Sequence, residues 1–220
     1  MKFGLIGYPI AHSGSPELFS TFCSGRYAYE LIETRDFKLA WETFIAEYQA
    51  VNVTMPFKEE AARHADYRSA GVERTGAANI LVKTARGIEA HNSDYLAVSE
   101  ILQGLSDPSI RTVAVIGMGG AGKAAAAAAI DCGFRLCTYH HDEITDGVSA
   151  DVVIYTLPCE VPGAGSIRCR FLIESNYASP TLRDAGISAP DGSPARYIGG
   201  EIWLEAQARL GYPLMFGKSE

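Results

Sequence analysis

The sequence predicts an α/β protein built from two domains. Runs of β-forming residues alternate with segments of helical composition along the whole chain, which is typical of a mostly parallel sheet with helices on both faces. Two turn-rich stretches, at residues 103–109 and 188–194, interrupt this alternation and mark candidate boundaries. With 220 residues and 47% hydrophobic composition, the chain can bury a core in one large or two small domains.

The individual elements follow from local composition. The predicted strands are Phe3–Ile6, Tyr27–Ile32, Val51–Val53, Ala78–Lys83, Thr112–Ile116, Arg135–Tyr139, Val152–Tyr155 and Phe171–Glu174. The predicted helices are Phe37–Tyr48, Ser93–Leu105, Gly122–Cys132 and Glu201–Leu210. We therefore expect a first domain over residues 1–107, completed by a C-terminal segment at 197–220, and a second domain over residues 108–196.

Composition excludes several classes of function. The net charge of −7 and the lack of a basic run argue against a nucleic-acid partner, which needs clustered Lys and Arg. No stretch of about 18 apolar residues predicts a membrane span, and the short apolar start breaks at Pro9, unlike a signal peptide. Five cysteines without a C-x-x-C pair suggest reduced thiols and no zinc site. We expect a cytoplasmic monomer or homodimer, free of metal, that acts on a small molecule.

A glycine-rich turn follows the strand predicted at Thr112–Ile116. Its glycines at 117, 119 and 122 match G-x-G-x-x-G, and the alanine run that follows is a strong helix former. Such a turn brings backbone N–H groups and a helix N-terminus close to a pyrophosphate, so the sequence predicts a Rossmann-type dinucleotide-binding domain. A tight packing turn without a ligand is the alternative. The predicted cofactor contacts are Gly117, Gly119, Gly120, Ala121 and Gly122.

The ribose of a bound dinucleotide is expected near the end of the next strand, at residues 139–143. Asp142 there would accept from a free 2′-hydroxyl and favour NAD. His140 or His141, when protonated, would meet a 2′-phosphate and favour NADP. A solvated polar loop is the third interpretation.

Short polar clusters are expected at strand ends ahead of the glycine turn, where open α/β sheets place ligand groups. They are His12-Ser13-Gly14-Ser15-Pro16, Asn52-Val53-Thr54-Met55-Pro56-Phe57-Lys58, Gly76-Ala77-Ala78-Asn79 and His91-Asn92-Ser93-Asp94. In content and order, these clusters and the glycine turn resemble the shikimate dehydrogenase family. The resemblance covers nearly the whole chain, and the N-V-T-x-P-x-K run is its most specific part.

The resemblance implies an NADP-dependent oxidoreductase that reversibly reduces 3-dehydroshikimate to shikimate, a step of aromatic amino-acid biosynthesis in the chorismate pathway. It further implies an N-terminal substrate domain, a Rossmann-type domain and an active site in the cleft between them. The implied catalytic pair is Lys58 and Asp94. The implied substrate ligands are Ser13 and Ser15 for the carboxylate, Thr54, Asn79 and Gln207 for hydroxyls, and Tyr177. His140 and Gly200 join the implied cofactor contacts.

The chemistry agrees with the residue types at the catalytic pair. Oxidising a secondary alcohol requires removal of its hydroxyl proton as hydride leaves, and a lysine next to an aspartate can do this. Which of Lys58 and Asp94 is the base stays open. Taken alone, Lys58 could be a surface lysine, and Ser15 could be an N-cap ahead of Pro16.

The sequence also departs from the family pattern. The family's loop after the second strand of the cofactor domain carries Asn-Arg-Thr, whose arginine pairs with the 2′-phosphate, whereas this chain has Tyr139-His140-His141. The cofactor domain is short after Tyr139, and we expect one helix to be missing. NADP is the family expectation, and an NAD-preferring quinate or shikimate dehydrogenase is an alternative. A metabolite-binding module without catalysis is another.

Overall fold

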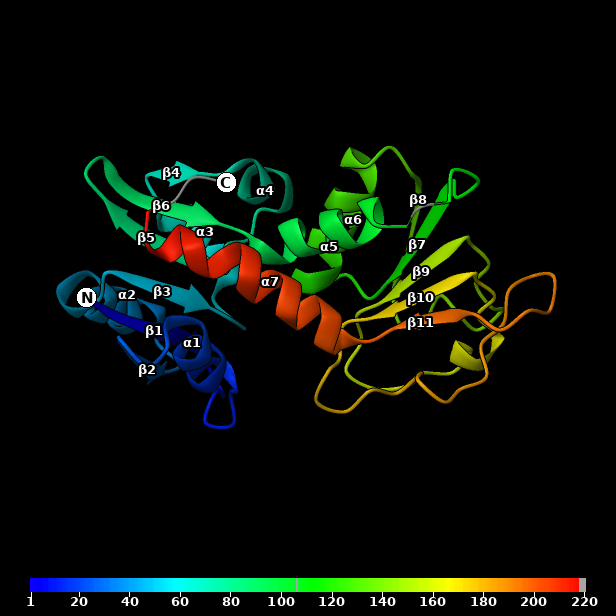
Figure 1. Cartoon of the computed structure of the whole chain (residues 1–220), viewed down its shortest axis with the longest axis horizontal. Coiled ribbons are helices and arrows are strands. Elements are labelled where there is room, and N and C mark those ends of the chain that lie inside the picture. Colours follow the sequence, from blue (N-terminus) through cyan, green and yellow to red (C-terminus); the bar gives the residue numbers. More distant parts are fainter. Residues whose placement is uncertain (106, 218–220) are drawn as a thin grey trace. The chain divides into compact units, whose positions relative to one another are not determined.

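The computed structural model describes residues 1–105 and 107–217, and it divides into two compact units (Figure 1). The first unit contains residues 1–93 and the chain from 207 onward, and the second contains residues 94–206. The chain thus changes unit at 93/94 and 206/207, whereas composition placed the boundaries at 107/108 and 196/197. Ser106 in the predicted boundary segment and the last three residues of the predicted segment 197–220 lie outside the described residues.

The first unit is built on a mixed sheet of six strands in the order β2-β1-β3-β5-β6-β4. β1 pairs in parallel with β2 and β3, whereas β5 is antiparallel to both β3 and β6. The prediction of a mostly parallel sheet is confirmed for this unit, because β4 pairs in parallel with β6 and one strand of the six, β5, runs against the others. β6, which forms a hairpin with β5, was not predicted. The strands are Lys2–Gly7, Ala28–Glu33, Ala50–Val53, Tyr67–Arg68, Ile80–Thr84 and Gly87–His91, β1 to β6 in order.

Helices cover both faces of this first sheet, as predicted. One face packs its Ile6, Val51 and Leu81 against apolar residues of α2, α3 and α4. On the other face, the ring of Phe3 lies 5.0 Å from that of Phe19 on α1, and Phe19 lies 5.2 Å from Tyr212 on α7. The helices are α1 Ser15–Cys23, α2 Phe37–Glu47, α3 Lys58–His64, α4 Ala70–Thr75 and α7 Gly200–Met215, which begins in the second unit.

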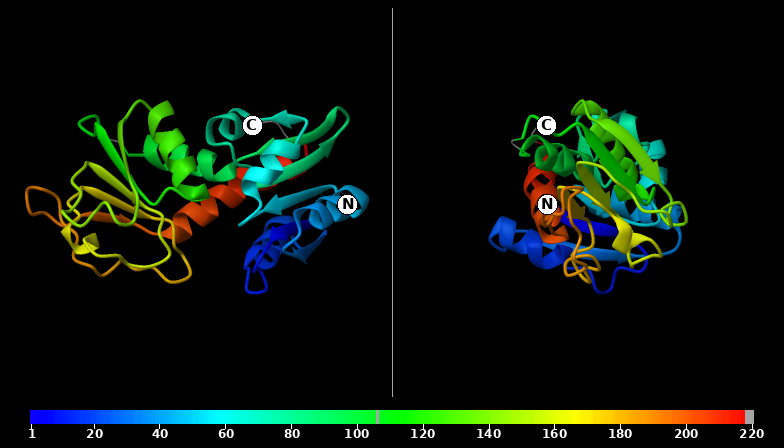
Figure 2. Two further views of the ribbon diagram at one scale, coloured as in Figure 1. Left: turned by 180° about the vertical axis from the view of Figure 1, so that it is seen from behind. Right: turned by 90° about the vertical axis from the view of Figure 1, so that its right-hand side faces the viewer.

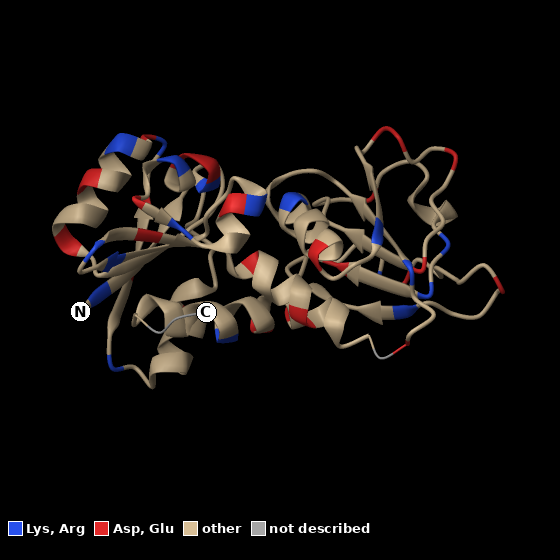
Figure 3. Ribbon diagram, turned by 90° about the horizontal axis from the view of Figure 1, so that it is seen from above, with Lys and Arg blue, Asp and Glu red and all other residues tan. Residues whose placement is uncertain are grey.

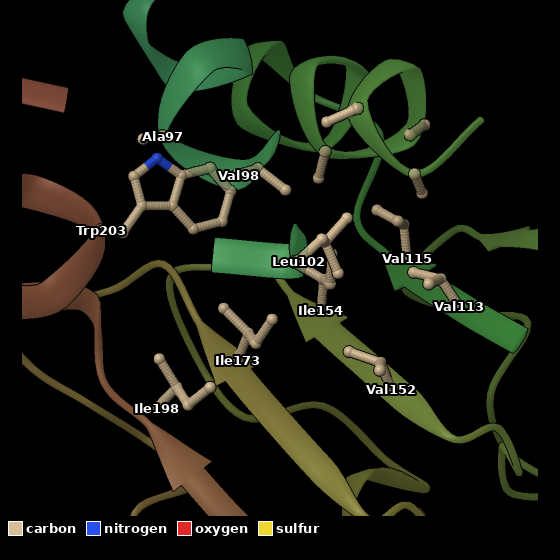
Figure 4. Packing of buried hydrophobic residues seen from close by; sticks show 14 of the residues in the cluster. Ala97, Val98, Leu102, Val113, Val115, Val152, Ile154, Ile173, Ile198 and Trp203 are labelled. Carbon is tan, nitrogen blue, oxygen red and sulfur yellow. The ribbon is translucent and has the colours of Figure 1, made fainter. Parts of the chain in front are cut away.

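The second unit is built on a fully parallel sheet of five strands in the order β11-β10-β9-β7-β8. Its strands are β7 Thr112–Ile116, β8 Arg135–Tyr139, β9 Val152–Tyr155, β10 Phe171–Glu174 and β11 Arg196–Ile198. Helices α5 (Ser93–Gln103), α6 (Gly120–Asp131) and the first residues of α7 pack on one face. There Val113, Val115 and Ile154 meet Leu102 and Trp203 in one apolar cluster (Figure 4).

Loops cover the opposite face of the second sheet, so the prediction of helices on both faces is wrong here. Alternate side chains of the same strands, such as Ile116 and Val153, pack there against loop residues. Residues 140–170, described without a gap, contain only a three-residue 3-10 turn outside β9, and residues 175–195 contain no helix (Figure 2). The apolar residues that these loops contribute are Ile144, Val148, Ala164, Ile167, Cys169, Leu182 and Ile187.

The carboxylate of Glu174 organises this loop-covered face. Glu174 ends β10 and is completely buried. One of its oxygens accepts from the backbone N–H of Thr181 at 2.6 Å and from its hydroxyl at 2.9 Å, and the other accepts from the N–H of Leu182 at 3.2 Å and from Tyr197 at 2.7 Å. Burial and this carboxylate raise the pKa of Tyr197 to about 12. The buried carboxylate thus accepts four hydrogen bonds, two of them from loop backbone N–H groups that would bond to backbone carbonyls if this segment were a helix.

Candidate active site

Polar side chains from four strands gather at one edge of the first sheet. β1 and β3 end at this edge, where Thr54 donates its N–H to the carbonyl of Ile6 at 2.9 Å. β5 begins there and β6 ends there, because the hairpin reverses direction, and Asn79 donates its N–H to the carbonyl of His91 at 3.0 Å. Asn79 therefore precedes its strand instead of following one, yet it joins the same edge as the other clusters.

The two serines expected to bind a carboxylate lie at the start of α1. The helix N-cap is Gly14, so the interpretation of Ser15 as the N-cap is wrong. Instead, Ser13 Oγ accepts from the N–H of Ser15 at 3.2 Å and lies 3.0 Å from Ser15 Oγ. The two hydroxyls thus stand together at the positive end of a helix, an arrangement suited to an anion.

Asn79 is buried and fixed by the residue before Asp94. Its Oδ1 accepts from the backbone N–H of Ser93 at 2.8 Å, and its Nδ2 donates to Ser93 Oγ at 3.0 Å. The neighbouring Asn92 donates to Thr75 Oγ1 at 3.1 Å and to the carbonyl of Ala77 at 2.9 Å. These bonds tie the chain before β5 to the chain after β6.

Tyr29 and Asn52 extend this polar set and were not identified as site residues from the sequence. Tyr29 donates its hydroxyl to Asn52 Oδ1 at 2.8 Å, and Asn52 Nδ2 donates to the carbonyl of Asn79 at 3.3 Å. Burial, and secondarily Tyr212, raise the pKa of Tyr29, and the hydroxyl of Ser15 opposes the shift. Asn52 stands in the N-V-T run, and its polar side chain in a buried strand was the available signal.

Lys58 begins α3, and Thr54 lies in the loop that leads to it. The loop is closed by an N–H of Phe57 donated to the carbonyl of Thr54 at 3.0 Å. A Cβ on Gly7 would lie 2.4 Å from Thr54 Cγ2, so only glycine lets the ends of β1 and β3 approach this closely. Lys58 is half-buried and belongs to the first unit.

Asp94 lies in the first turn of α5 and belongs to the second unit. It is 6% exposed, and its Oδ1 accepts from the indole N–H of Trp203 at 3.2 Å. Gln207, one turn further along α7 from Trp203, is half-buried and is counted with the first unit. Trp203 is a further residue that sequence reasoning missed, because 109 positions separate it from Asp94.

The glycine turn after β7 has the shape that a pyrophosphate requires. Gly117 has a positive φ of 93°, and a Cβ on Gly122 would lie 1.8 Å from the carbonyl oxygen of Gly117. A Cβ on Gly119, the N-cap of α6, would meet nothing within 4 Å, so this position faces open space. Gly120, Ala121 and Gly122 form the first turn of the helix, so the predicted contacts fit a dinucleotide phosphate.

In the loop after β8, the carboxylate of Glu143 contacts the backbone at the position where the ribose is expected. His140, His141 and Asp142 are all exposed. The backbone N–H of His140 donates to Glu143 Oε2 at 2.6 Å, so a carboxylate already occupies a backbone donor at the expected ribose position.

Tyr177 and Gly200 meet within the second unit. Tyr177 is 48% exposed, whereas Gly200 is buried at the start of α7. A Cβ on Gly200 would lie 2.6 Å from the backbone nitrogen of Tyr177, so the absence of a side chain lets this turn pack against the helix N-terminus.

Comparison with known proteins finds similarity to shikimate dehydrogenases. The profile of the shikimate dehydrogenase substrate-binding domain matches residues 5–81. A shikimate dehydrogenase (NADP(+)) of Acidovorax sp. (strain JS42) is 41% identical over 125 residues, which are 53% of this chain and 44% of that protein. The chain thus spans about half the length of the curated relatives it matches.

Solved structures resemble the chain over nearly its full length. The shikimate dehydrogenase of Mycobacterium tuberculosis has a TM-score of 0.74 at 26% identity and covers 99% of this chain and 94% of its own. The shikimate 5-dehydrogenase of Thermus thermophilus, solved with NADP(H) and shikimate, has a TM-score of 0.81 at 21% identity, with 99% and 94% coverage.

Fold and site together define a two-domain α/β protein in which a mixed sheet with a polar edge is joined to a Rossmann-type sheet with a glycine turn. The match of residues 5–81 and the named relatives make this assignment specific. Residues 5–81 are thus similar to the substrate-binding domain of shikimate dehydrogenases, and the chain as a whole is similar in fold to solved shikimate dehydrogenases.

Proposed function

We propose that the protein is an NADP-dependent shikimate dehydrogenase that reversibly reduces 3-dehydroshikimate to shikimate. The observation that carries this proposal is the polar edge of the first sheet, where Ser13, Ser15, Thr54, Lys58 and Asn79 all lie within the segment that matches the family profile. The name of the Acidovorax relative supports NADP as the cofactor.

In this proposal, the paired hydroxyls of Ser13 and Ser15 donate to the substrate carboxylate, next to the helix N-terminus of α1. Asn79 and Thr54 bind ring hydroxyls, and Gln207 and Tyr177 complete the set. Because Asn79 is locked by Ser93, its amide is already oriented before substrate binds.

Lys58 and Asp94 act on the oxygen at which the substrate is reduced. NADPH, when bound, supplies the hydride to the carbonyl carbon. The Lys58 and Asp94 pair delivers the proton to the carbonyl oxygen and takes it back in the oxidative direction. The ammonium also stabilises negative charge that develops on that oxygen. The glycine turn of residues 117–122 would hold the pyrophosphate, with His140 and Gly200 as further contacts.

One observation favours a second candidate, an NAD-preferring quinate or shikimate dehydrogenase. The Glu143 carboxylate accepts from the N–H of His140 at 2.6 Å, at the end of β8. A carboxylate at this position repels a 2′-phosphate and accepts readily from a free 2′-hydroxyl.

The test is to mix the purified protein with shikimate and with NADP or NAD and follow the absorbance of reduced nicotinamide. Reduction of NADP supports the first proposal, and reduction of NAD alone supports the second. No reduction of either, together with calorimetric binding of shikimate, overturns both and favours a metabolite-binding module.

We further propose that the protein works in the cytoplasm as a monomer or homodimer. All five cysteines are free thiols, and no helix among the described residues has the length and apolarity to cross a membrane. Lys and Arg are spread along the ribbon among Asp and Glu and do not form one long basic segment in the described residues (Figure 3), which supports a small-molecule ligand. Light scattering coupled to size exclusion measures the oligomeric state.

A further inference from the structure

Trp203 donates a hydrogen bond to Asp94, and both side chains are buried. The indole N–H lies 3.2 Å from Asp94 Oδ1, with Trp203 3% exposed and Asp94 6% exposed. The two residues belong to the same unit but to different helices, α7 and α5. The bond therefore depends on the packing of these two helices and not on local chain geometry.

The chemistry of the indole restricts what this bond can do. The N–H is only a donor, so it can bind Asp94 solely through a lone pair of the carboxylate. The terminal torsion of an aspartate is broad, and without a fixed partner the carboxylate plane samples a wide range of angles. A buried donor at 3.2 Å removes much of that freedom.

Packing fixes the donor itself. The indole ring belongs to the main apolar cluster of the second unit, and it lies beside Ala97 and Val98 of α5 (Figure 4). These two residues follow Asp94 by one turn on the same helix. The ring thus packs against the same helix that carries the carboxylate, and this packing sets the position of the ring relative to the carboxylate.

We propose that Trp203 is a positioning residue for the reaction, whose indole N–H holds the Asp94 carboxylate in the orientation needed for proton transfer. This inference rests on the proposed dehydrogenase function of Asp94. It assigns Trp203 no contact with substrate or cofactor. A group that orients an acid or base acts on the chemical step, so its loss lowers kcat and leaves KM for shikimate unchanged.

The first test is Trp203→Phe, which keeps an aromatic ring and deletes the N–H. We expect kcat to fall about 10-fold, the scale of one lost hydrogen bond to a charged group, with KM for shikimate within about twofold of wild type. The matched control is Trp41→Phe, which alters the other tryptophan, half-buried on α2 beside Phe37 and Phe44. We expect kcat of this control to remain at the wild-type value.

A second test separates the N–H from the packing of the ring. Trp203 is replaced by 3-benzothienylalanine, in which sulfur takes the place of the N–H, or by 7-azatryptophan, which retains the N–H. We expect the benzothienyl protein to show the same loss of kcat as Trp203→Phe and the azatryptophan protein to restore most of it. Thermal midpoints of all variants report whether the fold is intact.

The third test is a double-mutant cycle with Asp94→Asn. If Trp203 acts through Asp94, Trp203→Phe has little further effect on kcat in the Asp94→Asn background. Full additivity of the two substitutions, or wild-type kcat in the benzothienyl protein, overturns this inference but leaves the proposed role of Asp94 in place. Wild-type turnover of Asp94→Asn itself overturns the proposed role of Asp94 and, with it, this inference.

Discussion

The two sheets bury their faces by different means. The first sheet has helices on both sides, whereas one side of the second sheet is covered by loops whose apolar side chains fill the same role. Where loops replace helices, backbone groups need other partners, and the loops pair with one another at Ser149, Arg168 and Ser188 and with the carboxylate of Glu174. A sheet face thus requires apolar contact and satisfied backbone groups, and helices are one of two ways to supply them.

The largest expected effect concerns the polar edge of the first sheet. Lys58→Ala should lower turnover about 10²-fold or more, because the variant loses acid–base help and stabilisation of developing charge. Steady-state rates of NADP reduction with shikimate measure it. Lys38→Ala, an exposed lysine on α2 that pairs only loosely with Glu42, is the matched control and should leave the rate unchanged. A wild-type rate in the Lys58 variant would show that Lys58 at this edge takes no part in the reaction.

Substitutions in the glycine turn test whether this turn binds a dinucleotide or is only a tight packing turn. Gly122→Ala should destabilise the fold by about 1–3 kcal/mol, because its Cβ would overlap the Gly117 carbonyl. Gly119→Ala should leave stability unchanged and weaken binding of NADP, because its Cβ fills only the open space that a pyrophosphate needs. Thermal denaturation and calorimetry with NADP separate the two. Equal NADP affinity in Gly119→Ala and wild type would favour the packing interpretation.

The loop-covered face depends on a charge, and Glu174→Gln tests this dependence. The amide has the same shape but places an NH₂ group against donors, so we expect a loss of about 1–3 kcal/mol in the free energy of unfolding. Denaturant titration measures it, with the exposed Glu205→Gln as the control. Equal stability of the two variants would show that apolar contact alone holds the loops.

The smallest effect is expected at Asp107, near the start of the second unit. Bonds from Ser109 and the guanidinium of Arg170 lower the pKa of Asp107 from 3.8 to about 2. Its contribution is therefore present above pH 3.8 and is lost as the pH falls toward about 2. The thermal midpoint of Asp107→Asn should lie slightly below wild type at neutral pH and converge with it at low pH. A constant difference across that range would contradict the assignment.

Sequence patterns identified the parallel core of the second unit well. β7, β8, β9 and β10 lie where predicted, because each is a continuous run of β-forming residues bounded by turns. β6 was missed because its sequence, Gly-Ile-Glu-Ala-His, contains weak β-formers, and the hairpin with β5 forms through tertiary pairing. Without β6, the antiparallel part of the first sheet could not be foreseen.

The candidate site was predictable where residues are close in sequence and not where packing brings them together. The serine pair, the N-V-T run and the glycine turn were found as local motifs. The bonds from Tyr29 to Asn52 and from Trp203 to Asp94 join residues far apart in the chain, and no local pattern reveals them. The assigned roles of Ser13, Asn79 and the remaining site residues stay predictions.

The β5–β6 hairpin also fixes how this region can vary among relatives. Asn79 stands at one foot of the hairpin and Ser93 at the other, and the two are hydrogen-bonded. Because side chains alternate between faces, deleting a single residue from either strand would turn every side chain beyond it to the wrong face. Length changes at the two-residue tip, Ala85-Arg86, leave both feet in place. Insertions and deletions in this segment should therefore accumulate at the tip, while the number of residues in each of the two strands stays the same.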